Sequence, residues 1–242
     1  MIDRIPQLVT VSSRYTVQCL DVLGRLKWRA EFQNLVVNTG LNMLLDNSFG
    51  SVPGSVAAYV GLVGAGTGTV AITSGAAAVT GTGTSFANGD NGSELIIVGA
   101  GASGADLITT VSGNPASGTA LTAAANAGTT VSGAAYAIEP RAADTMSSKS
   151  FNETAPYSNA TRPTWTKNGA ASGGAMSNSS SKASFTINAT GRIFGAFMAT
   201  DSTKSGTTGI LYGGGLFTTG GSRAVQSGDT VNVQVDLSVT AA

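Results

Sequence analysis

A long internal stretch without any basic residue most constrains the fold of this chain. Residues 63–138 contain no lysine or arginine, and all thirteen basic residues lie outside them. The stretch consists mainly of Gly, Ala, Thr, Ser and Val, with sequence of mixed charge on both sides. Such a break in composition is typical of a small domain inserted into a larger one. We therefore predict a host domain formed by residues 1–62 and 139–242, interrupted by an inserted domain at 63–138.

The charge composition favours association and argues against charged partners. Charged residues make up 11% of the chain, against about 25% in a typical domain. The formal net charge is zero, so nothing indicates a general attraction to nucleic acid or to an anionic membrane. Low charge near neutrality favours self-association. We expect a homo-oligomer or a component of an assembly, with no nucleic-acid or membrane partner.

The absence of histidine lowers the expectation of catalysis. The chain has no histidine, which removes the commonest proton-transfer group near neutral pH and the commonest metal ligand. Asp90, Asn91 and Glu94 offer oxygens for a cation, but their spacing does not match a calcium loop. Asp144, Asp201 and Asp229 are isolated loop aspartates, which usually form local turns. We predict that the protein is not an enzyme and holds no metal or cofactor.

The single cysteine and the N-terminus give further expectations. Cys19 is the only cysteine, and it alternates with Tyr15 and Val17, so we predict a buried, unreactive thiol. The segment 1–6 lacks the positively charged region followed by an apolar region that is typical of a signal peptide. No stretch approaches the ~20 apolar residues that a spanning helix needs. We expect synthesis in a cytoplasm.

Alternating apolar residues predict an all-β host domain. Residues 14–20 and 26–32 alternate around a Gly-containing turn and predict a hairpin. Five apolar residues at period two between Val231 and Val239 predict the last strand. The glycines in 213–215 indicate a bulge or a close backbone approach. Leucines with helical spacing in 41–46 predict one helix of at most two turns. The fold expected for the host domain is therefore β-sandwich-like with one short helix.

The inserted stretch has its own repeating pattern of strand-like segments and turns. Short apolar runs alternate with Gly-Ser-Thr-Asn turns, and we predict five or six strands. The apolar runs are 70–72, 76–79, 95–98, 107–111 and 134–138. A disordered Gly/Ser-type linker is the alternative, but β-branched residues recur too regularly for one. We predict a small inserted β-barrel or sandwich.

Six segments of the host domain carry a resemblance to a known family: Phe32–Asp46, Ala58–Leu62, Ala143–Ser148, Ala155–Pro163, Ser181–Thr190 and Ser227–Val233. They resemble virion structural proteins of tailed bacteriophages. The inserted stretch separately resembles a small β-module of phage tail fibres and spikes, through Ala78–Phe86 and Gly101–Leu107. The resemblance implies a virion protein assembled in the bacterial cytoplasm, without enzyme activity.

Two places in the virion are compatible with this resemblance. A capsid decoration or cement protein would bind the major capsid protein and staple neighbouring capsomers, with the insert projecting outward. A tail, neck or fibre-associated protein would use the same insert as a spacer or as a glycan-facing tip. We favour decoration, because the chain is compact and has no long fibrous repeat.

The candidate interface residues belong to two segments. An N-terminal arm, residues 1–10, could lie along another subunit through Ile2, Ile5 and Leu8, with Arg4 beside them. In the segment 162–165, Arg162 and Trp165 form an aromatic and cation pair that fits a subunit contact. A loop tip that covers the edge of the core is an equal alternative there. If the chain binds carbohydrate instead, Trp165 and Tyr157 are the candidate residues.

Overall fold

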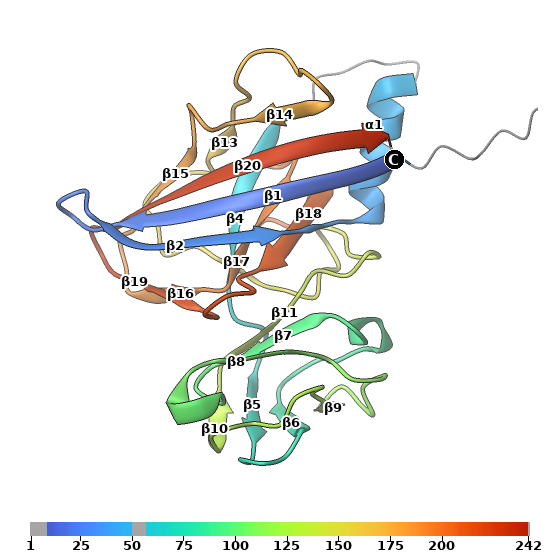
Figure 1. Ribbon diagram of the computed structural model, residues 1–242, viewed down its shortest axis with the longest axis vertical. Helices are drawn as coiled ribbons and strands as arrows, with labels where there is room; N and C mark the ends of the chain where they lie inside the picture. Colours follow the sequence, from blue (N-terminus) through green and yellow to red (C-terminus); the bar gives the residue numbers. More distant parts are fainter. Residues whose placement is uncertain (1–8, 50–56, 242) are drawn as a thin grey trace, which may run out of the picture.

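The computed structural model describes residues 9–49 and 57–241. Antiparallel sheets dominate, with one α-helix, α1 (Asn38–Phe49), and two single turns of 3-10 helix at Asn88–Asp90 and Ala102–Gly104. Figure 1 shows a large upper part built from the N- and C-terminal strands and a smaller lower part built from the middle of the chain. The predicted all-β, sandwich-like fold is confirmed. We call the two parts the host part and the insert.

The first sheet of the host part is built on two long strands. Its spatial order is β14 (Ala175–Ser177), β20 (Thr230–Ala241), β1 (Val9–Leu20) and β2 (Leu26–Gln33), with β15 (Ala183–Thr186) also on β20. The predicted hairpin is β1–β2, in which Tyr15 pairs with Phe32. Val231, Val233 and Val235 are fully buried. The period-two pattern of β20 therefore identifies its inward face correctly.

The second sheet lies across the first, and its central strands are buried on both faces. It contains β12 (Glu153–Thr154), β13 (Thr164–Trp165), β4 (Ala58–Val63), β17 (Gly195–Ala199), β18 (Leu211–Leu216) and β3 (Leu35–Val36). Every residue of β17 and β18 is buried. Continuous apolar runs replace alternation when both faces of a strand are covered. A separate two-stranded ribbon consists of β16 (Gly191–Ile193) and β19 (Arg223–Val225).

The main hydrophobic core fills the space between these two sheets. Tyr15 and Phe32 stack with ring centroids 5.0 Å apart, and Phe32 meets Phe217 edge to face at 5.6 Å. Ala196 and Met198 of β17 contribute from the opposite sheet. Cys19 is fully buried in this core, as predicted, and burial is the main reason that its pKa rises to about 12.

Glycines allow close packing within the second sheet. Gly61 of β4 pairs with Phe197 of β17, and the Phe197 ring lies where a Gly61 side chain would be. A side chain on Gly213 would overlap the carbonyl oxygen of Leu35. The close backbone approach predicted for the 213–215 glycines is therefore confirmed.

The insert consists of two small sheets around a core of its own. One sheet has the order β10 (Val131–Ala134), β5 (Thr69–Ile72), β6 (Ala78–Thr82) and β9 (Ala120–Thr122); the other is β11 (Tyr136–Ile138), β7 (Glu94–Ile97) and β8 (Leu107–Thr110). These strands pair only among themselves in the described chain. Phe86 and Tyr136 meet edge to face at 5.5 Å in the core. The domain boundaries at 62/63 and 138/139 stay a prediction.

Helix α1 is longer than the two turns that the sequence predicts. It covers twelve residues and begins at Asn38, before the predicted range 41–46. The Thr39 hydroxyl donates to the carbonyl of Leu211 at 2.8 Å. A side chain on Gly40 would overlap the Tyr212 carbonyl oxygen, so the helix lies directly on β18. This packing stabilises the first turn of the helix, which precedes the leucines from which the helix was predicted.

Candidate functional surfaces

The predicted interface residues have different outcomes. Ile2, Arg4, Ile5 and Leu8 lie outside the described residues. Trp165 is half-buried, packs against the main core and donates its indole N–H to the Val235 carbonyl at 3.2 Å. It therefore covers the edge of the core, which is the alternative we considered for this segment. Whether it also contacts a partner stays a prediction.

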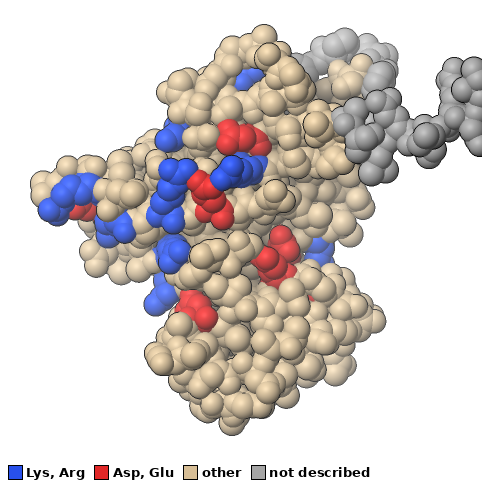
Figure 2. Space-filling model, in the orientation of Figure 1, with Lys and Arg blue, Asp and Glu red and all other residues tan. Residues whose placement is uncertain are grey.

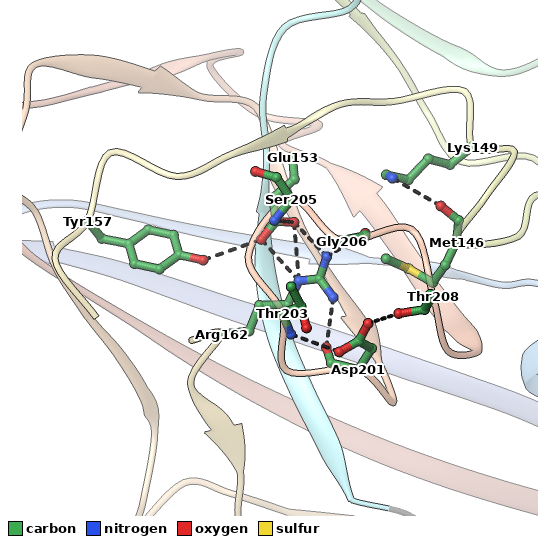
Figure 3. A network of polar contacts seen from close by, with 10 residues as sticks. All are labelled: Met146, Lys149, Glu153, Tyr157, Arg162, Asp201, Thr203, Ser205, Gly206 and Thr208. Atoms are coloured by element: carbon green, nitrogen blue, oxygen red, sulfur yellow. Dashed lines mark hydrogen bonds and ion pairs between the residues drawn. The ribbon is translucent and has the colours of Figure 1, made fainter. Parts of the chain in front are cut away.

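Arg162 is buried, so it does not supply the cation of the subunit contact that we considered for the segment 162–165. The Arg162 side chain is 0% exposed and forms an ion pair at 2.7 Å with Glu153, which is 1% exposed. Its guanidinium also donates to the carbonyls of Asp201 at 2.7 Å and Gly206 at 3.0 Å, as Figure 3 shows. The five donors of a guanidinium suit such a site, because one group can bind a carboxylate and several carbonyls together. Arg162 thus links its own loop to β12 and to the loop that contains Asp201 and Gly206, and it is not available as a surface cation.

Tyr157, a candidate sugar-binding aromatic, is also buried. Its ring is 1% exposed and packs edge to face on Phe185 at 4.9 Å. Its hydroxyl donates to Glu153 at 3.3 Å, and burial raises its pKa strongly. Together with the engaged indole of Trp165, this leaves no exposed aromatic platform at the two positions proposed for sugar binding.

A third apolar cluster joins the insert to the host part. It contains Phe151 and Phe197 of the host part, whose ring centroids lie 5.1 Å apart, and Ile96 and Ala137 of the insert. All four side chains are nearly or fully buried. Because the two parts share this cluster, the insert is packed against the host part as well as tethered to it.

Polar contacts reinforce the same junction. Asp106 of the insert accepts hydrogen bonds from the backbone N–H and the hydroxyl of Ser222, at 2.7 and 2.6 Å. Asp90 forms an ion pair with Arg141 at 3.0 Å, and Asp144 lies 3.7 Å from the same guanidinium. Burial raises the pKa of Asp90. Two of the three acidic residues of the insert therefore bind host-part residues.

The third acidic residue, Glu94, lies beside another carboxyl group. Its backbone N–H points at Glu139 at 3.5 Å. Burial and the nearby Glu139 raise the pKa of Glu94 to about 7, and burial also raises the pKa of Glu139. Glu139 lines an open cleft of about 540 Å³ between the two parts, together with Arg141 and Asn91. Glu94 does not line this cleft, so only one of the two carboxyls faces it.

The outer surface of the insert carries no charge. All three acids of residues 63–138 lie at the junction, and the stretch has no basic residue. Figure 2 shows charged side chains on the host part and along the junction, while the lower lobe is bare of them. The lobe therefore presents Gly, Ala, Ser, Thr and Asn, a surface of hydroxyl, amide and methyl groups.

An apolar groove lies at the α1 end of the host part. Its volume is about 420 Å³. The side chains that form its walls come from α1, β13, β14, β17, β18 and β20, and include Met43, Leu44, Trp165, Met176, Met198 and Leu237. Lys167 stands on its rim and is exposed. A pocket of this size and apolar character is suited to an apolar side chain or a short apolar segment.

The tip of the β1–β2 hairpin exposes three aliphatic side chains. Val22, Leu23 and Leu26 are 77%, 71% and 58% exposed. Figure 1 shows this hairpin projecting beyond the rest of the host part. Clustered exposed aliphatics are uncommon on a monomer surface and mark interaction sites. We call Asp21–Leu26 the hairpin tip.

The loop aspartates bind their own backbone, as predicted. Asp144 accepts from the Arg141 N–H at 3.2 Å, Asp201 from Thr203 at 2.9 Å, and Asp229 from Gln226 at 2.8 Å. Within residues 9–49 and 57–241, no group of three or more metal-ligating side chains comes together. No helix in the same residues is long and apolar enough to cross a membrane.

Comparison with known proteins adds no relative. No protein-family model, no curated protein and no solved structure matches this chain.

Proposed function

We propose that the chain is a structural protein of a tailed-bacteriophage virion that decorates the capsid. The observation that carries this proposal is the fixed, uncharged lobe of the insert. Its acids Asp90 and Asp106 bind Arg141 and Ser222 of the host part, and the shared apolar cluster packs behind them. An uncharged lobe that is packed firmly against the host part is suited to projection from a surface rather than to catalysis. The resemblance of the host segments to virion proteins supports the same reading.

The host part and the insert have different roles in this proposed function. The host part binds the major capsid protein or a neighbouring copy, and the insert projects from the particle. The projecting hairpin tip and the apolar groove supply contact surfaces that the described residues of a single chain leave uncovered. The proposal includes no catalytic reaction, because Glu94 and Glu139 do not face a common cleft.

A tail, neck or fibre-associated role is the second candidate. The uncharged lobe is also compatible with this role, since a spacer or tip can be a neutral projecting module. Decoration is preferred because the chain has no long fibrous repeat. Copy number separates the two roles. Quantitative mass spectrometry of purified virions should find hundreds of copies, comparable to the major capsid protein, if the chain decorates the capsid. A few to a dozen copies per particle would reject decoration in favour of the tail.

The N-terminal arm offers a second test of the proposal. β1 begins at Val9, where it pairs with Ala241, so a deletion of residues 1–8 leaves the strand pairing intact. This deletion should lower occupancy on particles and leave the melting temperature of the free chain unchanged. Unchanged occupancy after the deletion would reject the arm as a particle contact.

A further inference from the structure

The hairpin tip is a fixed shape and not a loose loop. The Asp21 carboxylate accepts hydrogen bonds from the backbone N–H groups of Leu23 and Arg25, both at 2.9 Å. The Asp21 N–H donates to the Arg25 carbonyl at 2.8 Å, and Gly24 takes the positive φ that this turn requires. The base of the hairpin is also held, because Lys27 pairs with Asp229 at 2.6 Å.

A fixed apolar tip is a good binding element. Val22 and Leu23 are presented to water by a turn that is already ordered. Little conformational entropy remains to be lost when such a turn binds a partner. Exposing two aliphatic side chains on an ordered turn has no benefit for the isolated chain, so their burial by a partner explains the arrangement.

The groove at the other end of the molecule is the surface that we consider as the binding site for such a tip. It is concave and apolar, with Met43 and Leu44 on one wall and Trp165 and Leu237 on the other walls. The tip cannot enter the groove of its own chain. Ser13 of β1 lies opposite Leu237, and the eight residues from Ser13 to Leu20 already span roughly 25 Å. The tip begins only after Leu20, and Figure 1 shows the tip and α1 at opposite ends of the sheet.

Charges near the two surfaces are also complementary. The tip carries Asp21 and Arg25, which pair with each other at 2.7 Å in the isolated chain. The groove has the exposed Lys167 on its rim and the exposed Asp46 on α1, one residue before a lining side chain. Neither of these two has an ion-pair partner among the described residues. A docked tip could place Arg25 toward Asp46 and Asp21 toward Lys167, which favours one orientation.

We infer that the hairpin tip of one copy of this chain docks into the apolar groove of a second copy. The contact is head to tail, because each copy offers its tip at one end and its groove at the other. Head-to-tail contacts generate rings when the rotation closes and open chains when it does not. One tip is a small contact, so an isolated pair binds weakly and repeated contacts in an assembly add strength. This inference deepens the proposed function by naming the partner of one surface.

Two complementary variants of the full chain test the inference. Leu23→Asp places a charge on the apolar tip and leaves the groove unchanged. Thr164→Asp places a charge on the exposed rim of the groove and leaves the tip unchanged. By analytical ultracentrifugation at roughly 0.5 mM, the wild-type chain should form concentration-dependent oligomers. Each variant alone should be a monomer, and an equimolar mixture should form a 1:1 dimer through the one intact tip and the one intact groove.

The matched control adds the same charge elsewhere. Ser132→Asp lies on an exposed position of the insert and should associate like the wild type. A monomeric wild-type chain, a Leu23→Asp chain that still associates, or a mixture that stays monomeric would each overturn the inference. Unchanged circular dichroism and melting temperature verify that both variants fold.

Cross-linking gives a readout that weak affinity does not obscure. Cys19 is fully buried, so engineered thiols react selectively. A mixture of Leu23→Cys and Thr164→Cys chains should give a cross-linked heterodimer with a short bismaleimide, whereas Leu23→Cys with Ser132→Cys should not. Cross-links between two Leu23→Cys chains alone would indicate a tip-to-tip contact and reject the groove. These measurements use the purified chain without particles, so their failure is distinct from a failure of the virion assignment.

Discussion

The guanidinium of Arg162 lies against both carboxylate oxygens of Glu153, and neither side chain reaches solvent. The Arg162 Nε donates to the two oxygens at 3.1 and 3.2 Å, and its terminal nitrogen approaches one of them at 2.7 Å. The ring of Phe197 lies 5.3 Å from the same guanidinium. Glu153 also accepts hydrogen bonds from Tyr157 and Ser205. A buried ion pair of this kind is costly to break from one side only.

Removing the arginine should therefore destabilise the host part strongly. Arg162→Ala leaves Glu153 buried without its counterion, and we expect a loss of about 3–5 kcal/mol in the free energy of unfolding. Arg162→Lys should recover little, since an ammonium cannot reach the carboxylate and two carbonyls at once. Urea unfolding measures both variants.

A surface pair provides the control for this prediction. Arg29 forms an exposed pair with Glu31, so Arg29→Ala should cost less than about 1 kcal/mol. Similar losses for Arg162→Ala and Arg29→Ala would show that the buried pair contributes no more than a surface pair.

The Glu94 and Glu139 carboxyls should make stability fall as pH rises. The pKa of Glu94 is raised from 4.5 to about 7 by burial and by Glu139. The folded chain therefore holds a proton that the unfolded chain has released between these values. Linkage then requires that the free energy of unfolding decrease from about pH 4.5 to about pH 7. Other groups add their own slopes, so the comparison must be made between variants.

The variant Glu94→Gln isolates this effect. It should be more stable than the wild type at pH 8 by on the order of 1 kcal/mol, since Glu94 is only half-buried. It should show no such advantage at pH 4. Melting temperatures across this range provide the measurement, and a difference that is independent of pH would contradict the prediction.

Asp106 should fix the insert to the host part. One of its oxygens accepts from Ser222 and the other accepts from the Gly99 N–H at 3.1 Å. Asp106→Ala leaves these donors without their acceptor, and we expect a loss of about 2 kcal/mol. Hydrogen exchange should speed up at Gly99 and Ser222. The neighbouring exposed Ser103 supplies the control, and Ser103→Ala should leave both amides unchanged.

Gly61 should tolerate no side chain while Phe197 keeps its position. A methyl group on Gly61 would overlap the Phe197 ring, so Gly61→Ala should cost about 1–3 kcal/mol. Combining it with Phe197→Leu removes the overlap, and the double variant should lose less than the sum of the two single losses. Additive losses in denaturant unfolding would mean that the two residues do not interact in this way.

Regular patterns made much of the fold predictable. The period-two alternation from Val231 to Val239 identifies a strand and its buried face, because a half-buried strand leaves that signature in its sequence. The continuous apolar run around Phe197 has the opposite pattern, because β17 is covered on both faces. The start of α1 at Asn38 was not predictable, since its first turn depends on the packing of Gly40 against Tyr212 and not on local propensity.

The functional surfaces were harder to predict from the sequence than the fold. Arg162 looks like a surface cation because its sequence neighbours do not indicate its partner Glu153, which lies nine residues earlier in β12. The exposed Val22 and Leu23 resemble ordinary apolar residues until the structure shows that their turn projects into water. Burial and exposure at single positions depend on tertiary contacts, which a pattern of residue types does not contain.

The placement of all three insert acids at the junction has a consequence for how the outer lobe binds. A contact made by a surface without charges releases no counterions, so its affinity should not vary with the logarithm of the salt concentration. The lobe should therefore keep such contacts at low and at high salt concentration alike. The host part contains the lysines and arginines, so the affinity of contacts made by its charged surface should change with salt concentration.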